Sequence, residues 1–144
     1  MAKPRRGVGP TLVLDADGLS KLSAGDPAAR ALFLKSREQR SDVVTAATTL
    51  TEVLRGDARD ALIHTVLKHI TVVDLTESAG RQAGELLGRI GLSGHRYALD
   101  ALLAVVAMAQ PRPAVLLTSD PEDMAMLTEE PGVSKRDQIT VVHI

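Results

Sequence analysis

The chain has 144 residues, of which 44% are hydrophobic and 24% are charged, and these values are typical of one globular domain. It contains no cysteine, which excludes disulfide scaffolds, thiolate metal sites and cysteine nucleophiles. Phe33 and Tyr97 are its only Phe, Tyr or Trp residues, so a surface that stacks several bases on aromatic rings is excluded too. The net charge of −1 gives no overall signal for nucleic acid.

Apolar runs and helical periodicity alternate along the chain. After a Pro-, Gly- and Arg-containing stretch at 1–10, expected to be a mobile arm, we expect a single domain over 11–144. In chain order, the predicted elements are strand 11–14, helix 27–40, strand 43–45, helices 49–55 and 57–69, strand 70–73, helices 77–90 and 97–110, and strands 114–118 and 139–142. Most of these strands are apolar without alternation, which is typical of parallel strands covered on both faces. The pattern predicts an α/β fold with a mainly parallel sheet.

No segment of the sequence looks able to cross a membrane. The longest aliphatic run, at 101–109, is about half as long as a bilayer span requires. The apolar stretch after the basic residues at the beginning ends at Asp15, which is too early for a signal peptide. We therefore expect a cytoplasmic protein.

Four acids occupy positions that solubility does not explain. Asp15 directly follows the first predicted strand, and Asp120 follows the fourth almost at once. Glu52 and Asp100 interrupt apolar helical segments. Ligands of open α/β sheets bind beyond the carboxyl ends of the strands, so we expect the strand-end acids to face one site. A single Asp after a strand is also common in turns and helix caps, so only the joint arrangement of the four acids indicates a site.

Four carboxylates converging on one cleft repel one another unless a cation is present. Oxygen ligands of this kind suit Mg²⁺ or Mn²⁺. Such a site activates water and neutralises charge on a phosphate. Phosphodiester hydrolysis without a covalent intermediate is therefore the predicted reaction.

The order of four motifs resembles the PIN-domain family, and especially the small bacterial VapC-like toxins. The motifs are Leu-Val-Leu-Asp ending at Asp15, TxxTEVLRG over 48–56, RYALDALLAVVA over 96–107 and LLTSDPEDM over 116–124. The resemblance covers residues 11–144. It implies a PIN-like three-layer α/β/α domain with a mainly parallel central sheet of about five strands.

The same resemblance implies an activity and partners. It points to a Mg²⁺- or Mn²⁺-dependent endoribonuclease, a hydrolase that is usually a homodimer and acts as the toxin of a type II toxin–antitoxin pair. A small antitoxin protein is the implied partner and RNA the implied substrate. The matching catalytic and metal-binding residues are Asp15, Glu52, Asp100 and Asp120.

Several neighbouring residues extend the expected site. Asp123 is an alternative or additional ligand, because the fourth acidic position varies in the family. Asp17 stands where the family often has Ser or Thr. It either adds a fifth acid to the site or disturbs the hydrogen bond that this position usually makes to Asp15. Ser119 is expected to support the site by hydrogen bonding. Arg55 and Arg96 are candidates for phosphate contact, although both also fit surface helix charges.

Three alternatives remain open from the sequence. In a haloacid-dehalogenase-like phosphatase, Asp15 would be the nucleophile and Asp17 the acid/base, but Lys68 lacks the context of the required phosphate-binding lysine. A receiver-like module would use Asp74 as its phosphorylated residue, but no lysine follows the expected strand. A catalytically silent PIN domain that only binds a partner is the third.

Overall fold

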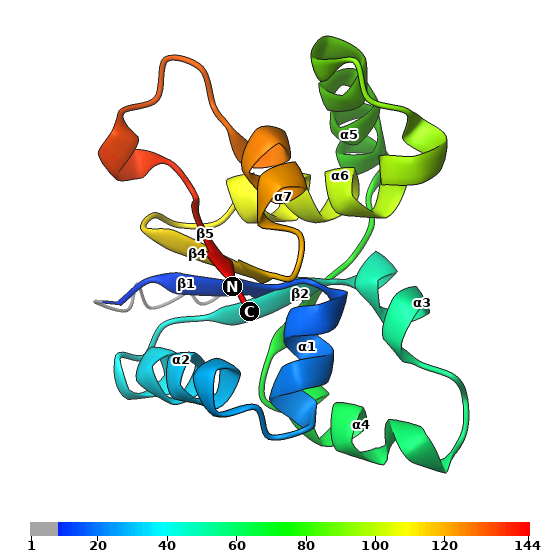
Figure 1. The fold of residues 1–144 in the computed structure, drawn as a ribbon, viewed down its shortest axis with the longest axis vertical. Helices are drawn as coiled ribbons and strands as arrows, with labels where there is room; N and C mark the ends of the chain where they lie inside the picture. The colour runs from blue at the N-terminus through cyan, green and yellow to red at the C-terminus, as the bar shows by residue number, and fades with distance from the viewer. Residues whose placement is uncertain (1–8) are drawn as a thin grey trace.

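The protein, described over residues 9–144 by a computed structural model, is built on one parallel sheet (Figure 1). Its strands are β1 (Thr11–Leu14), β2 (Val43–Ala46), β3 (Thr71–Val73), β4 (Ala114–Thr118) and β5 (Thr140–His143). They lie in the order β3-β2-β1-β4-β5, and every neighbouring pair is parallel. The predicted parallel sheet of five strands is confirmed. The first eight residues, and with them most of the expected arm, lie outside the described part.

Helices cover both faces of the sheet. On one face lie α1 (Ala16–Ser23), α2 (Pro27–Glu38) and α4 (Ala61–Leu67), and on the other lie α5 (Glu77–Ile90), α6 (Gly94–Met108) and α7 (Pro121–Thr128) (Figure 1). Each face has its own apolar core: Leu14, Leu19 and Leu117 lie in one, and Val13, Leu103 and Leu116 in the other. The strands feed both cores because successive side chains point to opposite faces. The predicted three-layer α/β/α architecture is therefore confirmed.

The sequence missed two short helices, and both directly follow strands. α1 begins one residue after β1, and α7 begins at Pro121, close behind β4. Each has only eight residues, and α1 contains a glycine and two serines, which are weak helix formers. Tertiary packing stabilises these helices where local propensity does not.

Two predicted helices begin at other residues than expected. The segment expected as one helix over 57–69 starts with a 3₁₀ turn at Ala58–Asp60 before α4. The segment expected at 97–110 starts at Gly94, with Ser93 as its N-cap. Asp100 therefore lies in the second turn of α6, too far from the start of the helix for its carboxylate to act as the N-cap.

The strand order defines a preferred site for a ligand. The chain proceeds from β1 outward to β2 and β3, and then returns to the other side of β1 to add β4 and β5. The order reverses between β1 and β4, and crevices at such switch points, at the carboxyl edge, are where open α/β sheets bind ligands. This order also differs from the flavodoxin-like 2-1-3-4-5 order of receiver-type modules, which removes that alternative. In residues 9–144, no helix is both long and apolar enough to span a bilayer.

Candidate functional site

Asp15 lies at the switch point, where β1 ends and α1 begins. Its backbone N–H donates to the carbonyl of Leu117 in β4, and its Oδ1 accepts a 2.7 Å hydrogen bond from the N–H of Gly18. Burial raises the pKa of Asp15 above its ordinary value, although hydrogen bonds from the Thr118 hydroxyl and from Gly18 partly offset this effect. Asp15 is thus both the N-cap of α1 and a partly buried acid held in one orientation.

Gly18 permits the close approach of α1 to this edge of the sheet. A Cβ at this position would lie 2.9 Å from the Leu117 carbonyl oxygen and 3.3 Å from Asp15 Oδ1. We expect Gly18→Ala to destabilise the protein by about 1–3 kcal/mol, because the backbone must shift to admit the methyl group. The matched control is Gly84→Ala in α5, where nothing lies within 4 Å of an added Cβ and a gain of about 0.5–1 kcal/mol is expected. Urea unfolding of both variants tests the pair, and a neutral Gly18→Ala would contradict the close contact.

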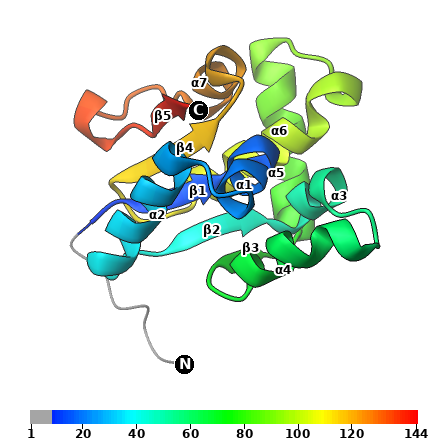
Figure 2. The ribbon, with the colours of Figure 1, turned by 60° about the horizontal axis from the view of Figure 1, so that its bottom comes forward.

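Glu52 lies on α3 (Leu50–Val53), a one-turn helix that follows β2 and packs against α1 (Figure 2). Val53 faces the core and is buried, whereas Glu52 is exposed. Partial burial raises the pKa of Glu52, and the negative charges of Asp100, Asp15 and Asp17 raise it further. The Glu52 carboxylate therefore lies within electrostatic reach of three acids from two other helices and the end of β1.

Asp100 lies on α6, a third element beside those that carry Asp15 and Glu52. It is partly buried at the start of the apolar part of this helix, and the four residues Leu103–Val106 that follow one turn later are buried. Burial raises the pKa of Asp100, and the charges of Asp120, Asp15 and Asp123 add to the increase. A helix has no local need for a carboxylate here, so this placement fits a polar site.

The remaining predicted residues complete the rim of the cluster. Asp120 is the N-cap residue of α7, and its N–H donates to the buried hydroxyl of Thr118 at 2.9 Å. Asp123 lies in the first turn of α7. Asp17 lies in the first turn of α1 and is exposed, and the Ser119 hydroxyl donates to its Oδ2. Ser119 thus pairs with Asp17 in this structure, across the gap between α1 and the end of β4.

We call Asp15, Asp17, Glu52, Asp100, Asp120 and Asp123 the acid cluster. Its members come from four separate parts of the chain, and charges within the cluster contribute to the raised pKa values of Asp15, Glu52 and Asp100. Within residues 9–144, however, no three histidine or carboxylate side chains are already arranged so that they could hold a metal ion. The donor chemistry is nevertheless that of a hard divalent cation, since every group is a carboxylate and mutual repulsion is relieved by positive charge.

The two candidate arginines differ in their surroundings. The Arg55 guanidinium donates to the carbonyls of Leu54 and Glu52, both at 2.9 Å, so it is engaged with the end of α3. Arg96 is exposed in the first turn of α6, one turn before Asp100, and its guanidinium lies 5.2 Å from the centre of the Tyr97 ring. Arg96 is therefore the better placed of the two for an anionic ligand.

Sequence reasoning missed the buried hydroxyls that support this edge. Thr118 is fully buried at the end of β4, where its hydroxyl donates a hydrogen bond to the Asp15 carboxylate and accepts one from the N–H of Asp120. Thr45 is likewise fully buried and donates to the Leu14 carbonyl at 2.8 Å, next to Asp15. Each threonine sits near the end of an apolar strand, which is the signal that could have marked it.

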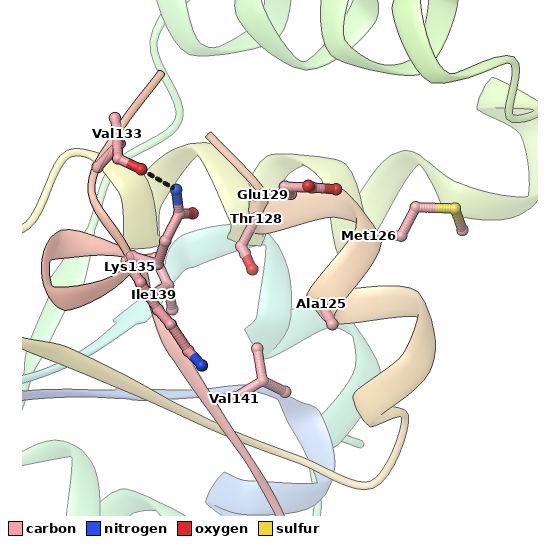
Figure 3. A pocket seen from close by; sticks show the side chains of 9 residues that line it. Ala125, Met126, Thr128, Glu129, Val133, Lys135, Ile139 and Val141 are labelled. Atoms are coloured by element: carbon pink, nitrogen blue, oxygen red, sulfur yellow. Dashed lines mark hydrogen bonds between the residues drawn. The ribbon is translucent and has the colours of Figure 1, made fainter. Parts of the chain in front are cut away.

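A separate groove of about 680 Å³ lies between α7 and the segment that leads into β5 (Figure 3). Met126 from α7 and Val133, Lys135 and Ile139 from that segment line it, and the Gln138 amide donates to the Val133 carbonyl at its rim. None of its lining residues belongs to the acid cluster, so the groove is not part of the candidate site.

Comparison with solved structures supports the fold independently. The chain is similar to a chain of the VapBC2 complex from Rickettsia felis bound to a promoter DNA fragment, with a TM-score of 0.63, 15% identity, and coverage of 92% of this chain and 98% of that one. For a chain of DNA-bound VapBC from Salmonella typhimurium, the TM-score is 0.63 and the identity 19%, with coverage of 92% of this chain and 98% of that one. For a chain of a toxin–antitoxin complex from Klebsiella pneumoniae, the TM-score is 0.60 and the identity 18%, with coverage of 89% of this chain and 99% of that one. No protein-family model and no curated protein matches the chain. The expected PIN-like fold is confirmed by these neighbours.

The fold also weakens the phosphatase alternative. A phosphatase of the haloacid-dehalogenase type requires a lysine that binds the phosphate beside the nucleophile, here Asp15. Lys68 is the C-cap residue of α4, and β3 begins three residues later at Thr71. Lys68 therefore lies at the amino edge of the sheet, opposite the acid cluster, and is not placed to bind a phosphate beside Asp15.

Proposed function

We propose that this chain is a metal-dependent endoribonuclease and the toxin of a toxin–antitoxin pair. The observation that carries the activity is the convergence of Asp15, Glu52 and Asp100 from three elements at the switch point of a PIN fold, where burial and neighbouring carboxylates raise the pKa of each. Carboxyl groups whose ionised forms are disfavoured by burial and by nearby negative charges cost the fold stability, and such perturbed groups concentrate at functional sites.

Asp15, Glu52, Asp100 and Asp120 are the residues that would hold Mg²⁺ or Mn²⁺, with Asp123 and Asp17 beside them. When bound, the ion supplies an acidified water and a positive charge next to the phosphate. The chain's own groups orient this chemistry: Thr118 and Gly18 hydrogen-bond to Asp15 and fix its direction. Arg96, one turn before Asp100 on α6, is the residue that would contact the phosphate. Because no three of these carboxylates are already arranged to hold an ion in residues 9–144, binding one requires their side chains to turn toward one another.

RNA is the proposed substrate because the cluster suits phosphodiester chemistry and the fold neighbours belong to toxin–antitoxin complexes. The scarcity of aromatic residues means that binding relies on phosphate contacts and shape, with little base stacking. An antitoxin protein is the proposed regulatory partner, and a homodimer is the proposed assembly.

Cleavage of labelled single-stranded RNA with Mn²⁺ and with EDTA tests the activity. The informative variant is Asp15→Asn, because its amide oxygen can still accept from the Gly18 N–H and so keeps the cap of α1. We expect metal-dependent cleavage by the wild type and its loss in this variant. Hydrolysis of a phosphomonoester without RNA cleavage would establish the phosphatase alternative, and binding without any cleavage would establish a silent module.

A further inference from the structure

The most deeply buried acid of the chain lies outside the acid cluster. Asp60 is 2% exposed, yet no arginine or lysine side chain forms an ion pair with it in the described residues. Its two carboxylate oxygens accept from the backbone N–H of Arg55 at 3.0 Å, and Oδ2 also accepts from the N–H of Gly56 at 2.7 Å. A buried carboxylate is costly, so this position requires a reason.

The backbone that Asp60 holds is the end of the helix that carries Glu52. α3 has four residues, and a single turn is not stable by itself. Leu54 closes the turn by donating to the Leu50 carbonyl, and the Arg55 side chain then donates to the Glu52 carbonyl. The next two N–H groups along the chain are those that Asp60 binds. The carboxylate therefore ties the start of α4 to the end of α3.

We propose that Asp60 is a positioning residue that fixes the short helix α3 and so the direction in which Glu52 faces the other members of the acid cluster. This inference rests on the proposed function, since positioning matters only if Glu52 takes part in the site. Asp60 does not touch the cluster and acts through the backbone of Arg55 and Gly56. The motif that the sequence presents as one unit, TEVLRG, thus depends on a carboxylate four residues beyond its final glycine.

Amide hydrogen exchange tests the clamp directly. In the wild type, we expect the N–H groups of Arg55 and Gly56 to exchange slowly, although both residues are exposed. Asp60→Asn replaces one accepting oxygen with an amide group, and exchange at both positions should accelerate at least about tenfold. Asp57→Asn is the matched control, because Asp57 is exposed in the same turn and its carboxylate accepts from Arg59. Rapid exchange in the wild type, or equal acceleration in the control, would overturn the proposal.

A double-mutant cycle separates positioning from general structural support. We expect Asp60→Asn to lower RNA cleavage by about 10- to 100-fold, as is typical for groups that orient a metal ligand. In a Glu52→Gln background, the same substitution should add little further loss, because its target is already removed. A full multiplicative loss in that background would refute positioning through Glu52. If the wild type does not cleave RNA, the proposed function fails, whereas the exchange experiment still decides whether the clamp exists.

Discussion

Asp100→Asn is expected to slow Mn²⁺-dependent RNA cleavage by at least about 100-fold, because groups that merely orient a metal ligand are already worth 10–100-fold. The same substitution should raise the melting temperature of the metal-free protein at neutral pH by a few degrees. Burial and the charges of Asp120 and Asp15 raise the pKa of Asp100, so its ionised form is unfavourable in the folded state. Asparagine removes that charge at nearly constant volume, and relief of one such unfavourable group shifts a domain of this size by about 2–4 °C per kcal/mol.

The opposite signs of the two effects make the experiment decisive. Substitution of a residue that supports the fold lowers both the stability and the activity of the protein, whereas substitution of a residue that serves only the function lowers the activity alone. Asp74→Asn is the matched control: Asp74 also follows a strand, β3, and is exposed, but it is not among the charges that act on the cluster. It should leave both cleavage and melting temperature nearly unchanged. A destabilised but active Asp100→Asn protein would contradict the assignment of Asp100 to the site.

The sheet was largely predictable because its strands are short apolar runs bounded by polar or turn residues. β1 and β4 begin and end where the sequence predicts, since Asp15 and Ser119 interrupt the two apolar runs. α1 and α7 were not predictable in the same way. Their stability comes from the contact of Leu19 with one core and of Met124 and Leu127 with the other, and neither helix has enough turns to show a clear period.

The candidate site divides along a similar line. Acids at strand ends and in apolar helices stand out in the sequence, because neither place calls for a charge. Residues that act by hydrogen bonding do not stand out. Thr118 reads as a strand residue and Asp60 as an early helix residue, and only the tertiary structure places their oxygens against Asp15 and against the backbone of Arg55. Which groups these side chains hydrogen-bond to is determined by the tertiary structure and cannot be inferred from local sequence.

Addition of Mn²⁺ is expected to stabilise the wild-type protein, and the effect should grow as the pH rises. A ligand at 100 times its dissociation constant adds about 2.7 kcal/mol to the free energy of unfolding. For a domain of this length that corresponds to an increase in melting temperature of about 5–10 °C. The expected increase is large because the ion would neutralise carboxylates that otherwise repel one another.

The direction of the pH effect follows from the raised pKa values of Asp15, Glu52 and Asp100. Between the ordinary carboxyl pKa, about 4, and the raised values, the folded state binds more protons than the unfolded state. These acids therefore cost the metal-free protein stability as the pH rises through that window, and below pH 4 they cost nothing. Protons and metal compete for the same oxygens, so the Mn²⁺-induced increase should be small at pH 4.5 and full at pH 7.5. Differential scanning fluorimetry with Mn²⁺ or EDTA at both pH values measures it, and an increase that persists in an Asp15→Asn/Asp100→Asn double variant would show that the ion binds outside the acid cluster.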